Sequence, residues 1–346
     1  MTMDTPKNLT NGATQVAPVG SIEASEDLTG IPGTHWLIVS VRALAPDGEG
    51  RLDLVNTSTH AIRALYPSPE AQVRFDAHTF HGQPDRPPER FNPHGLTIRR
   101  GANGVHQLLV VHHGVRESVE IFTVDTRDVL PRIHWRGCVL TPGSVTGNGV
   151  APMPDGFVMT QTTLPIPKKG GRALNFEEIE GGRSIGEVLA WSSRSGWSKV
   201  DTGGDLMPNG IETSADGEWL YYADSVRQTF NRFSFRAGAA KKHVIQTGFH
   251  SDNVHWAPDG SLLLAGQQGT LREIVEYFSG KEGAACGNAR VLRIDPQTMS
   301  VQPLVDCADF PLASGAVEIQ GTLWLGRIRG TIGRVDLRQV HTALPD

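Results

Sequence analysis

The chain has 346 residues, a formal net charge of −5 and 38% hydrophobic residues. The chain has no run of Lys or Arg, so a nucleic-acid partner is not expected. No uninterrupted apolar stretch reaches the ~18 residues of a membrane span, so a membrane partner is not expected either. The 39 Gly and 22 Pro predict frequent turns, which suits an all-β chain of this size folding as one domain.

The first 20 residues are polar and lack the hydrophobic region of a signal peptide. We expect a disordered or tag-like extension over 1–20, a single domain over 21–346, and a cytoplasmic protein. Cys138, Cys286 and Cys307 lack metal-ligand spacing, which favours inert thiols in a reducing compartment.

Turn signals recur along the chain at intervals of roughly 40 to 65 residues, and most precede an alternating apolar run. This period predicts four-stranded blades and an all-β, six-bladed β-propeller, closed by residues 322–337 together with an N-terminal strand. The signals are Pro46-Asp47-Gly48, Asn103-Gly104, Pro154-Asp155-Gly156, Ala215-Asp216-Gly217, Pro258-Asp259-Gly260 and Gln320-Gly321.

Two segments fall outside the repeat. Residues 164–188 are polar and Gly-rich, and residues 271–290 have some helical character. A long insertion in a compact domain is either a lid over a site or a surface excursion. Both readings are open for 164–188, which follows a strand close to the expected axis.

Polar residues stand seven positions ahead of successive turns. The residues are Glu26, Asn148, Asn209 and Asp252, which precede Gly33, Asp155, Asp216 and Asp259. Equivalent positions in a radial repeat converge on its axis, where carboxylate and amide oxygens form a cage suited to Ca²⁺. Asn253 offers a further amide oxygen. The alternative is that these are ordinary turn residues bonded to nearby backbone.

The same offset places His94, seven residues before Gly101, on the axis. His112 and His113 end an apolar run, and since neighbouring side chains of a strand face opposite ways, at most one points toward His94. Histidine is the natural proton acceptor near neutral pH, so His94 and one of this pair are catalytic candidates. Otherwise they are ordinary strand histidines.

Motifs of other catalytic classes do not occur. The chain has no G-x-S-x-G, H-E-x-x-H or C-x-x-C motif, and its Gly-rich pieces do not follow dinucleotide or phosphate-loop patterns. Met207, Trp256, Phe80 and Phe249 are candidates for the walls of a substrate pocket.

Several short pieces, in this order, resemble the calcium-dependent six-bladed propeller hydrolases, a superfamily that includes the gluconolactonases (regucalcin-like) and the paraoxonases. The chain looks most similar to the paraoxonase/arylesterase branch. The pieces are IEASEDL at 22–28, FNPHGL at 91–96, LLVVHH at 108–113, SVEIF at 118–122, NGIETSADGEWLYYAD at 209–224, SDNV at 251–254 and LWLGRIRG at 323–330.

The resemblance implies roles for individual residues. It implies a histidine pair at His94 and His113, and a second calcium at Asp27 that lacks one expected carboxylate because Gly149 stands in its place. It also implies that the catalytic calcium is held by Glu26, Asn148, Asn209, Asp252 and Asn253.

The expected function is therefore a calcium-dependent hydrolase of lactones or activated aryl esters, a lactonase or arylesterase acting on small molecules. Its base is either His94 or a metal-bound carboxylate. A metal-dependent lyase, isomerase or hydratase on the same scaffold is the alternative, followed by a non-catalytic ligand-binding propeller.

Overall fold

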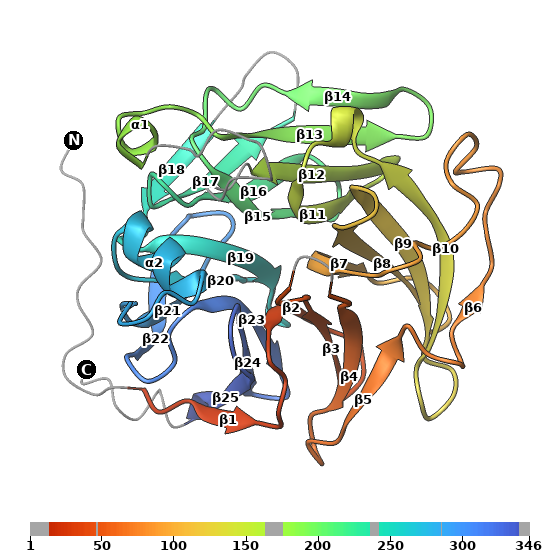
Figure 1. Ribbon diagram of the computed structural model, residues 1–346, viewed down its shortest axis with the longest axis horizontal. Coiled ribbons are helices and arrows are strands. Elements are labelled where there is room, and N and C mark those ends of the chain that lie inside the picture. Colours follow the sequence, from red (N-terminus) through yellow and green to blue (C-terminus); the bar gives the residue numbers. More distant parts are fainter. Residues whose placement is uncertain (1–13, 46–47, 163–175, 236–241, 285, 339–346) are drawn as a thin grey trace.

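Antiparallel β-sheets arranged around a central axis make up most of the structure (Figure 1). It is a computed structural model that describes residues 14–45, 48–162, 176–235, 242–284 and 286–338. The predicted all-β propeller is confirmed.

The largest sheet joins the two ends of the chain. Its two halves meet through one residue pair, Ser25 with Arg327. Residues 17–19, predicted to belong to the N-terminal extension, form a strand that pairs with β25 (Ala17 opposite Arg334), as expected for closure by an N-terminal strand. The strands are β1 (Ala17–Val19), β2 (Ser25–Gly30), β3 (Trp36–Val41), β4 (Arg51–Asn56), β5 (Ile62–Tyr66), β23 (Ala313–Ile319), β24 (Thr322–Arg327) and β25 (Ile332–Asp336).

The second sheet holds five strands, the edge strand β6 lying parallel to β10. Three four-stranded sheets follow. Their strands are β6 (Gln72–Val73), β7 (Pro93–Arg99), β8 (Val105–His112), β9 (Ser118–Asp125), β10 (Arg132–Leu140), β11 (Gly147–Met153), β12 (Gly156–Thr162), β13 (Gly186–Ser192), β14 (Gly196–Val200), β15 (Pro208–Thr213), β16 (Trp219–Asp224), β17 (Thr229–Ser234), β18 (Lys242–Gln246), β19 (His250–Trp256), β20 (Leu262–Gln267), β21 (Ala289–Ile294) and β22 (Val301–Cys307).

The inner strands form a closed ring. β2 contacts β7, and the contacts continue through β11, β15, β19 and β23 back to β2 (Figure 1). Apolar clusters fill the space between successive sheets, with Trp135, Trp324 and Tyr222 among the largest fully buried side chains. Burying such side chains between sheets is the main favourable term for this fold.

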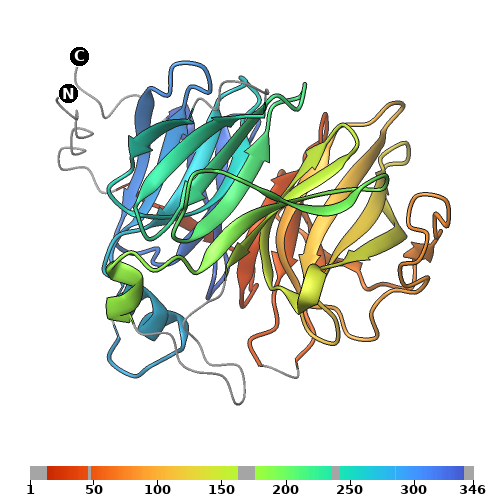
Figure 2. The same cartoon turned by 90° about the horizontal axis from the view of Figure 1, so that it is seen from above.

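Short helices lie on one face of the ring (Figure 2). They are α1 (Phe176–Glu180) and α2 (Leu271–Phe278), and a 3-10 turn spans Pro142–Ser144. α2 starts with a capping box, in which Thr270 Oγ1 accepts from the Glu273 N–H (3.2 Å) and Glu273 Oε2 accepts from the Thr270 N–H (2.7 Å). No helix within the described ranges is long and apolar enough to span a membrane.

Candidate active site and metal centre

Each inner strand interrupts its regular pairing, and in five of the six the interrupted stretch holds a residue that the repeated offset identified. The register shifts lie between Ser25 and Asp27, Pro93 and Leu96, Gly147 and Val150, Pro208 and Ile211, Ser251 and Val254, and Ala313 and Ala316. A bulge bends a strand and redirects the side chain of its extra residue. Six bulges at equivalent places therefore turn the polar side chains toward the axis.

Glycines behind these side chains let the inner strands approach closely. A Cβ on Gly95 would lie 2.3 Å from the Asn148 carbonyl oxygen, and one on Gly210 would lie 2.4 Å from the Asp252 carbonyl oxygen. At Gly149 the distance to the Asn209 carbonyl oxygen would be 3.0 Å. The glycine found in place of a second carboxylate therefore belongs to the packing of the ring, and an aspartate there would force neighbouring backbone to shift.

Five of the predicted residues meet in one cavity on the axis. Glu26, His94, Asn148, Asn209 and Asp252 line it, one from each of five inner strands, and all are buried. The sixth inner strand contributes Ser314 at the equivalent bulge, and its hydroxyl donates to the Ser25 carbonyl at 3.3 Å. The offset of seven thus identified positions that converge.

The ionised forms of the two carboxylates that line the cavity are disfavoured by their surroundings. Burial raises the pKa of Glu26, although the nearby Arg42 lowers it. Burial and the neighbouring carboxylates of Glu26 and Asp27 raise the pKa of Asp252 well above its ordinary value. Two buried carboxylates with little counter-charge favour either protonation or a cation.

The two asparagines present unpaired oxygens to the same cavity. The Oδ1 atoms of Asn148 and Asn209 are buried and have no hydrogen-bond partner among the described residues. An unsatisfied buried amide oxygen costs about 1–3 kcal/mol unless something else binds it. Two such oxygens beside two carboxylates make up the donor set that a hard cation such as Ca²⁺ prefers.

Two histidines adjoin the carboxylates. His94 Nε2 lies 3.4 Å from Glu26 Oε1, and its ring centroid is 5.0 Å from that of His113. Burial, His113 and Arg42 hold the pKa of His94 well below its ordinary value, so the imidazole is uncharged at neutral pH. His113 Nδ1 lies 2.7 Å from Glu117 Oε2, a contact that orients its ring. The sequence did not indicate Glu117.

The choice between the neighbouring histidines is decided by direction. His112 points away from the cavity, and its Nε2 lies 3.1 Å from the Arg90 carbonyl oxygen. Burial, with the nearby His113 and Arg116, lowers the pKa of His112 to about 3. Geometry therefore pairs His113 with His94.

The other two predicted ligands lie outside the cavity wall. Asn253 is buried, and its Nδ2 donates to the Glu26 carbonyl oxygen at 3.4 Å. Asp27 Oδ1 accepts from the Leu28 N–H (2.8 Å) and contacts His255 Nε2 (2.7 Å), while its Oδ2 accepts from the Leu96 N–H (2.9 Å). Because protein donors already occupy both oxygens, Asp27 does not suit a second calcium.

His255 contacts two buried carboxylates next to the cavity. Its Nδ1 lies 3.6 Å from Glu212 Oε1, opposite the contact to Asp27. Burial lowers its pKa, but the carboxylates of Asp27 and Glu212 outweigh burial and raise it to about 10. The imidazolium of His255 thus partly neutralises the two carboxylates of Asp27 and Glu212.

Replacing His255 by leucine is expected to destabilise the protein by about 3–5 kcal/mol near pH 6, because two buried carboxylates lose their partner. The pKa of His255 is about 10 in the folded state and about 6.5 in the unfolded chain. The stabilisation is therefore complete below about pH 6.5 and is lost as pH rises to about 10. Urea unfolding at about pH 6 and pH 9 measures both effects. His106→Leu, at a buried histidine without a carboxylate contact, is the control, and equal loss in both variants would contradict the assignment.

No group of three or more His, Cys, Asp and Glu side chains arranged to hold a metal occurs within the described parts of the chain. Two of the four oxygen donors in the axial cavity are amides, which are not among those residue types. The sequence also missed Arg42 and the apolar wall formed by α2, since neither belongs to the repeat. Of the four pocket candidates, Met207 lines the cavity, whereas Trp256, Phe80 and Phe249 do not.

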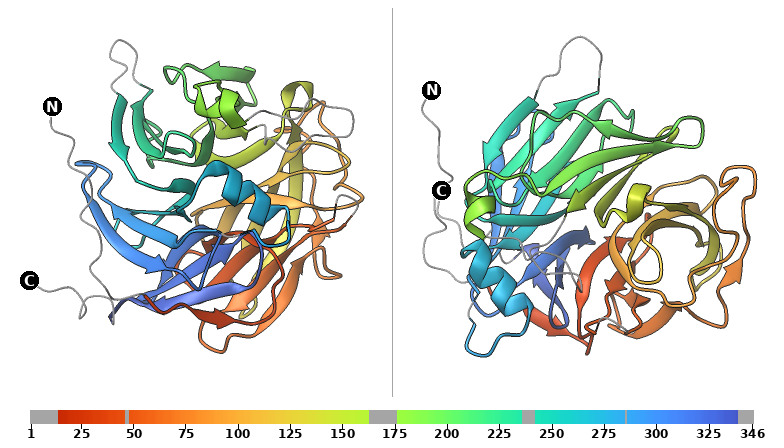
Figure 3. Two further views of the ribbon diagram at one scale, coloured as in Figure 1. Left: turned by 60° about the vertical axis from the view of Figure 1, so that its left-hand side comes forward. Right: turned by 45° about the horizontal axis from the view of Figure 1, so that its top comes forward.

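The segment 164–188, either a lid or a surface excursion, is described only in part, because residues 163–175 lie outside the described ranges. Its α1 residue Ile179 packs with Met207 and with Leu271 of α2, both of which line the cavity. The right-hand view of Figure 3 shows α1 next to α2, and the Arg272 guanidinium lies 4.8 Å from the Phe176 ring centroid. The described part of the segment therefore supports a wall of the cavity.

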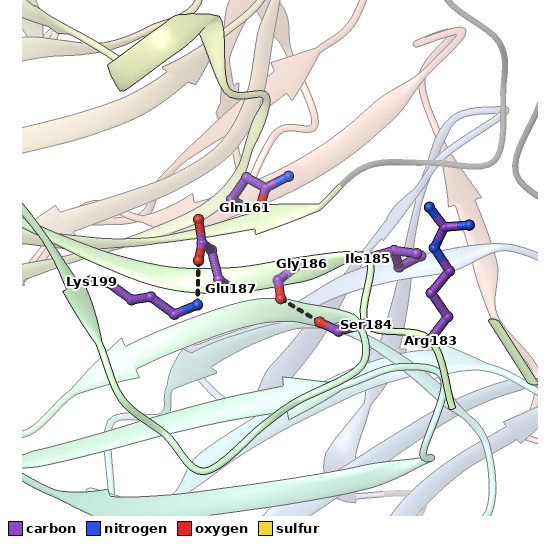
Figure 4. A pocket seen from close by; sticks show the side chains of 7 residues that line it. All are labelled: Gln161, Arg183, Ser184, Ile185, Gly186, Glu187 and Lys199. Carbon is purple, nitrogen blue, oxygen red and sulfur yellow. Dashed lines mark hydrogen bonds and ion pairs between the residues drawn. The ribbon is translucent and has the colours of Figure 1, made fainter. Parts of the chain in front are cut away.

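A more open hollow elsewhere on the surface is shown in Figure 4. Its Lys199 Nζ lies 2.7 Å from Glu187 Oε2, and Ser184 Oγ donates to the Gly186 carbonyl at 3.0 Å. These groups are satisfied within the protein. The axial cavity, with its unpaired oxygens, is the stronger candidate site.

Comparison with family models and with curated proteins finds no match. Solved structures of similar fold include a luciferin-regenerating enzyme, at 12% identity and TM-score 0.54 over 93% of this chain and 95% of that one. A putative gluconolactonase has 13% identity and TM-score 0.53 over 96% of each chain. The calcium-binding protein regucalcin from Agrobacterium tumefaciens has 12% identity and TM-score 0.51 over 93% of each. At such identities the similarity establishes a shared propeller fold.

Proposed function

We propose that this chain is a calcium-dependent hydrolase of lactones or activated aryl esters, of the paraoxonase/arylesterase kind. The observation that carries the proposal is the convergence of two buried carboxylates, two unpaired amide oxygens and an uncharged histidine in one cavity. The fold shared with a gluconolactonase and with a calcium-binding protein supports it. We count the eight-stranded sheet as two blades, which makes the propeller six-bladed, as the ring of six inner strands supports.

The residues present fit one calcium ion. We propose Glu26, Asn148, Asn209 and Asp252 as its ligands; Asn253, which the resemblance also implied, does not line the cavity. When bound, calcium would neutralise the carboxylates and polarise a substrate carbonyl. A second ion is not proposed, because both oxygens of Asp27 already contact protein donors and Gly149 offers no side chain.

We assign the base to His94. Its uncharged imidazole would take a proton from water as the water oxygen attacks the carbonyl carbon, and would return that proton to the leaving oxygen as the C–O bond breaks. The ring of His113, oriented by Glu117, faces the imidazolium formed in between. α2 would exclude bulk water from this exchange.

A panel of γ-lactones and phenyl esters, assayed with calcium-saturated protein, tests the proposal. We expect turnover of at least one class, with release of one carboxylic acid per ring or ester opened. Calcium binding without turnover of any member would reject the hydrolase in favour of a lyase, isomerase, hydratase or binding protein.

The metal-free protein is expected to lose stability as pH rises above about 4, the ordinary pKa of a carboxyl group. The pKa values of Asp252 and Glu26 are raised by folding, so the folded state holds more protons than the unfolded chain above that pH. Calcium at about 100 times its Kd should restore about 2.7 kcal/mol and oppose the trend. Melting temperatures with and without calcium measure this, and a metal-free protein that gains stability toward neutral pH would contradict it.

A further inference from the structure

An arginine outside the repeat enters the candidate site. Arg42 directly follows β3, and its side chain lines the axial cavity together with Glu26, His94 and Asp252. Of the described residues that line the cavity, Arg42 is the one lysine or arginine. Its position beside a proposed cation site needs a reason, because two positive charges there repel each other.

The guanidinium of Arg42 is only loosely engaged. Nη1 lies 3.4 Å from Glu26 Oε2, longer than the 2.7–2.9 Å typical of charge-assisted hydrogen bonds. Its Cζ lies 4.6 Å from the ring centroid of Phe278, an aromatic contact that holds the plane in place. Among the described residues no further hydrogen bond from this side chain is found, so most of its five N–H donors are available.

Another partly exposed arginine, Arg116, shows how fully such a group is paired when its role is structural. Arg116 donates to both carboxylate oxygens of Glu120 at 2.8 and 2.9 Å and to the Arg86 carbonyl at 3.1 Å. Arg42 lacks such a partner within the described ranges. Its fork is therefore pre-positioned for a group that the protein itself does not supply.

The wall opposite the polar ligands is apolar. Leu271, Ile274, Val275 and Phe278 of α2 line the cavity, and Ile328 joins them. Such a wall accommodates an apolar or aromatic body and lowers the local dielectric, which strengthens the pull of a cation on an anion. The arginine stands between this wall and Glu26.

We propose that Arg42 binds a carboxylate group of the substrate, so that the preferred substrates are lactones or aryl esters carrying a carboxylate next to an apolar body. This rests on the proposed function. In this proposal the carboxylate is present in the substrate before hydrolysis. The alternative is that Arg42 binds the carboxylate that hydrolysis itself produces.

Binding of benzoate and benzamide to calcium-saturated protein, measured by calorimetry, tests the contact without turnover. We expect benzoate to bind about 10-fold or more tightly than benzamide, and Arg42→Gln to remove that preference. Arg42→Lys should retain part of it, because charge remains while the fork is lost. Arg329→Gln is the matched control, since Arg329 Nε donates to the Phe278 carbonyl at 2.5 Å and steadies α2 from outside the cavity wall.

Calcium titration of the same variants shows whether Arg42 binds an anion or serves only as the ion-pair partner of Glu26. Arg42→Gln should bind calcium as tightly as the parent or more tightly, because a competing positive charge is removed. A benzoate preference that survives in Arg42→Gln, or that is missing in the parent, overturns the proposal.

Hydrolysis of 4-acetoxybenzoate and 4-acetoxybenzamide identifies the source of the carboxylate. A kcat/KM at least about 10-fold higher for the acid, lost in Arg42→Gln, assigns the contact to the substrate's own carboxylate. Equal hydrolysis of both esters sinks this proposal and leaves the hydrolase intact. No hydrolysis of either, nor of any lactone or ester of the panel, with the benzoate preference abolished by Arg42→Gln, rejects the hydrolase and leaves the anion site standing.

Discussion

Replacing Asp252 by asparagine is expected to lower calcium affinity by about 100-fold or more and to abolish most hydrolysis. Asp252 supplies one of the two carboxylates of the cavity wall, and its pKa is the one raised well above the ordinary value by burial and by Glu26 and Asp27. Neutralising it removes half of the wall's negative charge. The metal-free variant should in turn be more stable than the metal-free parent.

Equilibrium dialysis against calcium and assays before and after exhaustive chelation measure the effect. Asp53→Asn is the control, because Asp53 is equally buried but lies in β4 beside Arg51, away from the cavity. Added calcium should reactivate the chelated parent and leave the Asp252 variant inactive. Full activity of the parent after chelation would remove the metal from the reaction.

Replacing His94 by glutamine is expected to lower kcat by about 10²–10⁴-fold while calcium affinity changes little. The imidazole is the uncharged proton acceptor beside Glu26, and glutamine preserves its bulk and a hydrogen-bonding end but cannot take a proton. Loss of rate with the metal retained separates a base from a ligand.

The neighbouring histidines provide an internal comparison for this variant. His113→Gln should reduce the rate by about 10-fold, since it acts through His94, whereas His112→Gln should affect stability alone. Steady-state kinetics at saturating calcium measure all three variants. An unchanged rate in His94→Gln, or an equal fall in His112→Gln, would assign the base to another residue.

The ring geometry explains why a propeller suits this chemistry. Glu26, His94, Asn148, Asn209 and Asp252 each come from a different inner strand, so no single hairpin holds the site. The glycines that follow three of them bring the strands close enough for the side chains to line one cavity. The scaffold thus holds together two carboxylates that repel each other and that an unfolded chain would leave far apart.

Much of the candidate site was readable from the sequence because it repeats. Asx-Gly turns and alternating apolar runs are local signals, and the constant offset of seven located Glu26, Asn148, Asn209 and Asp252 without any tertiary information. The same count brought in His94. The family resemblance favoured His113 over His112, and the ring contact with His94 agrees with that choice.

What the tertiary structure decided concerns contacts between residues distant in sequence. Asp27 bonds to His255 and Leu96, so a residue expected to hold a second calcium instead forms a buried ion pair. Arg42 enters the cavity from outside the repeat, and α2 lays an apolar wall against it. Local periodicity specifies which way a strand residue faces, but bulges and packing between sheets set what that residue meets, and those interactions are long-range.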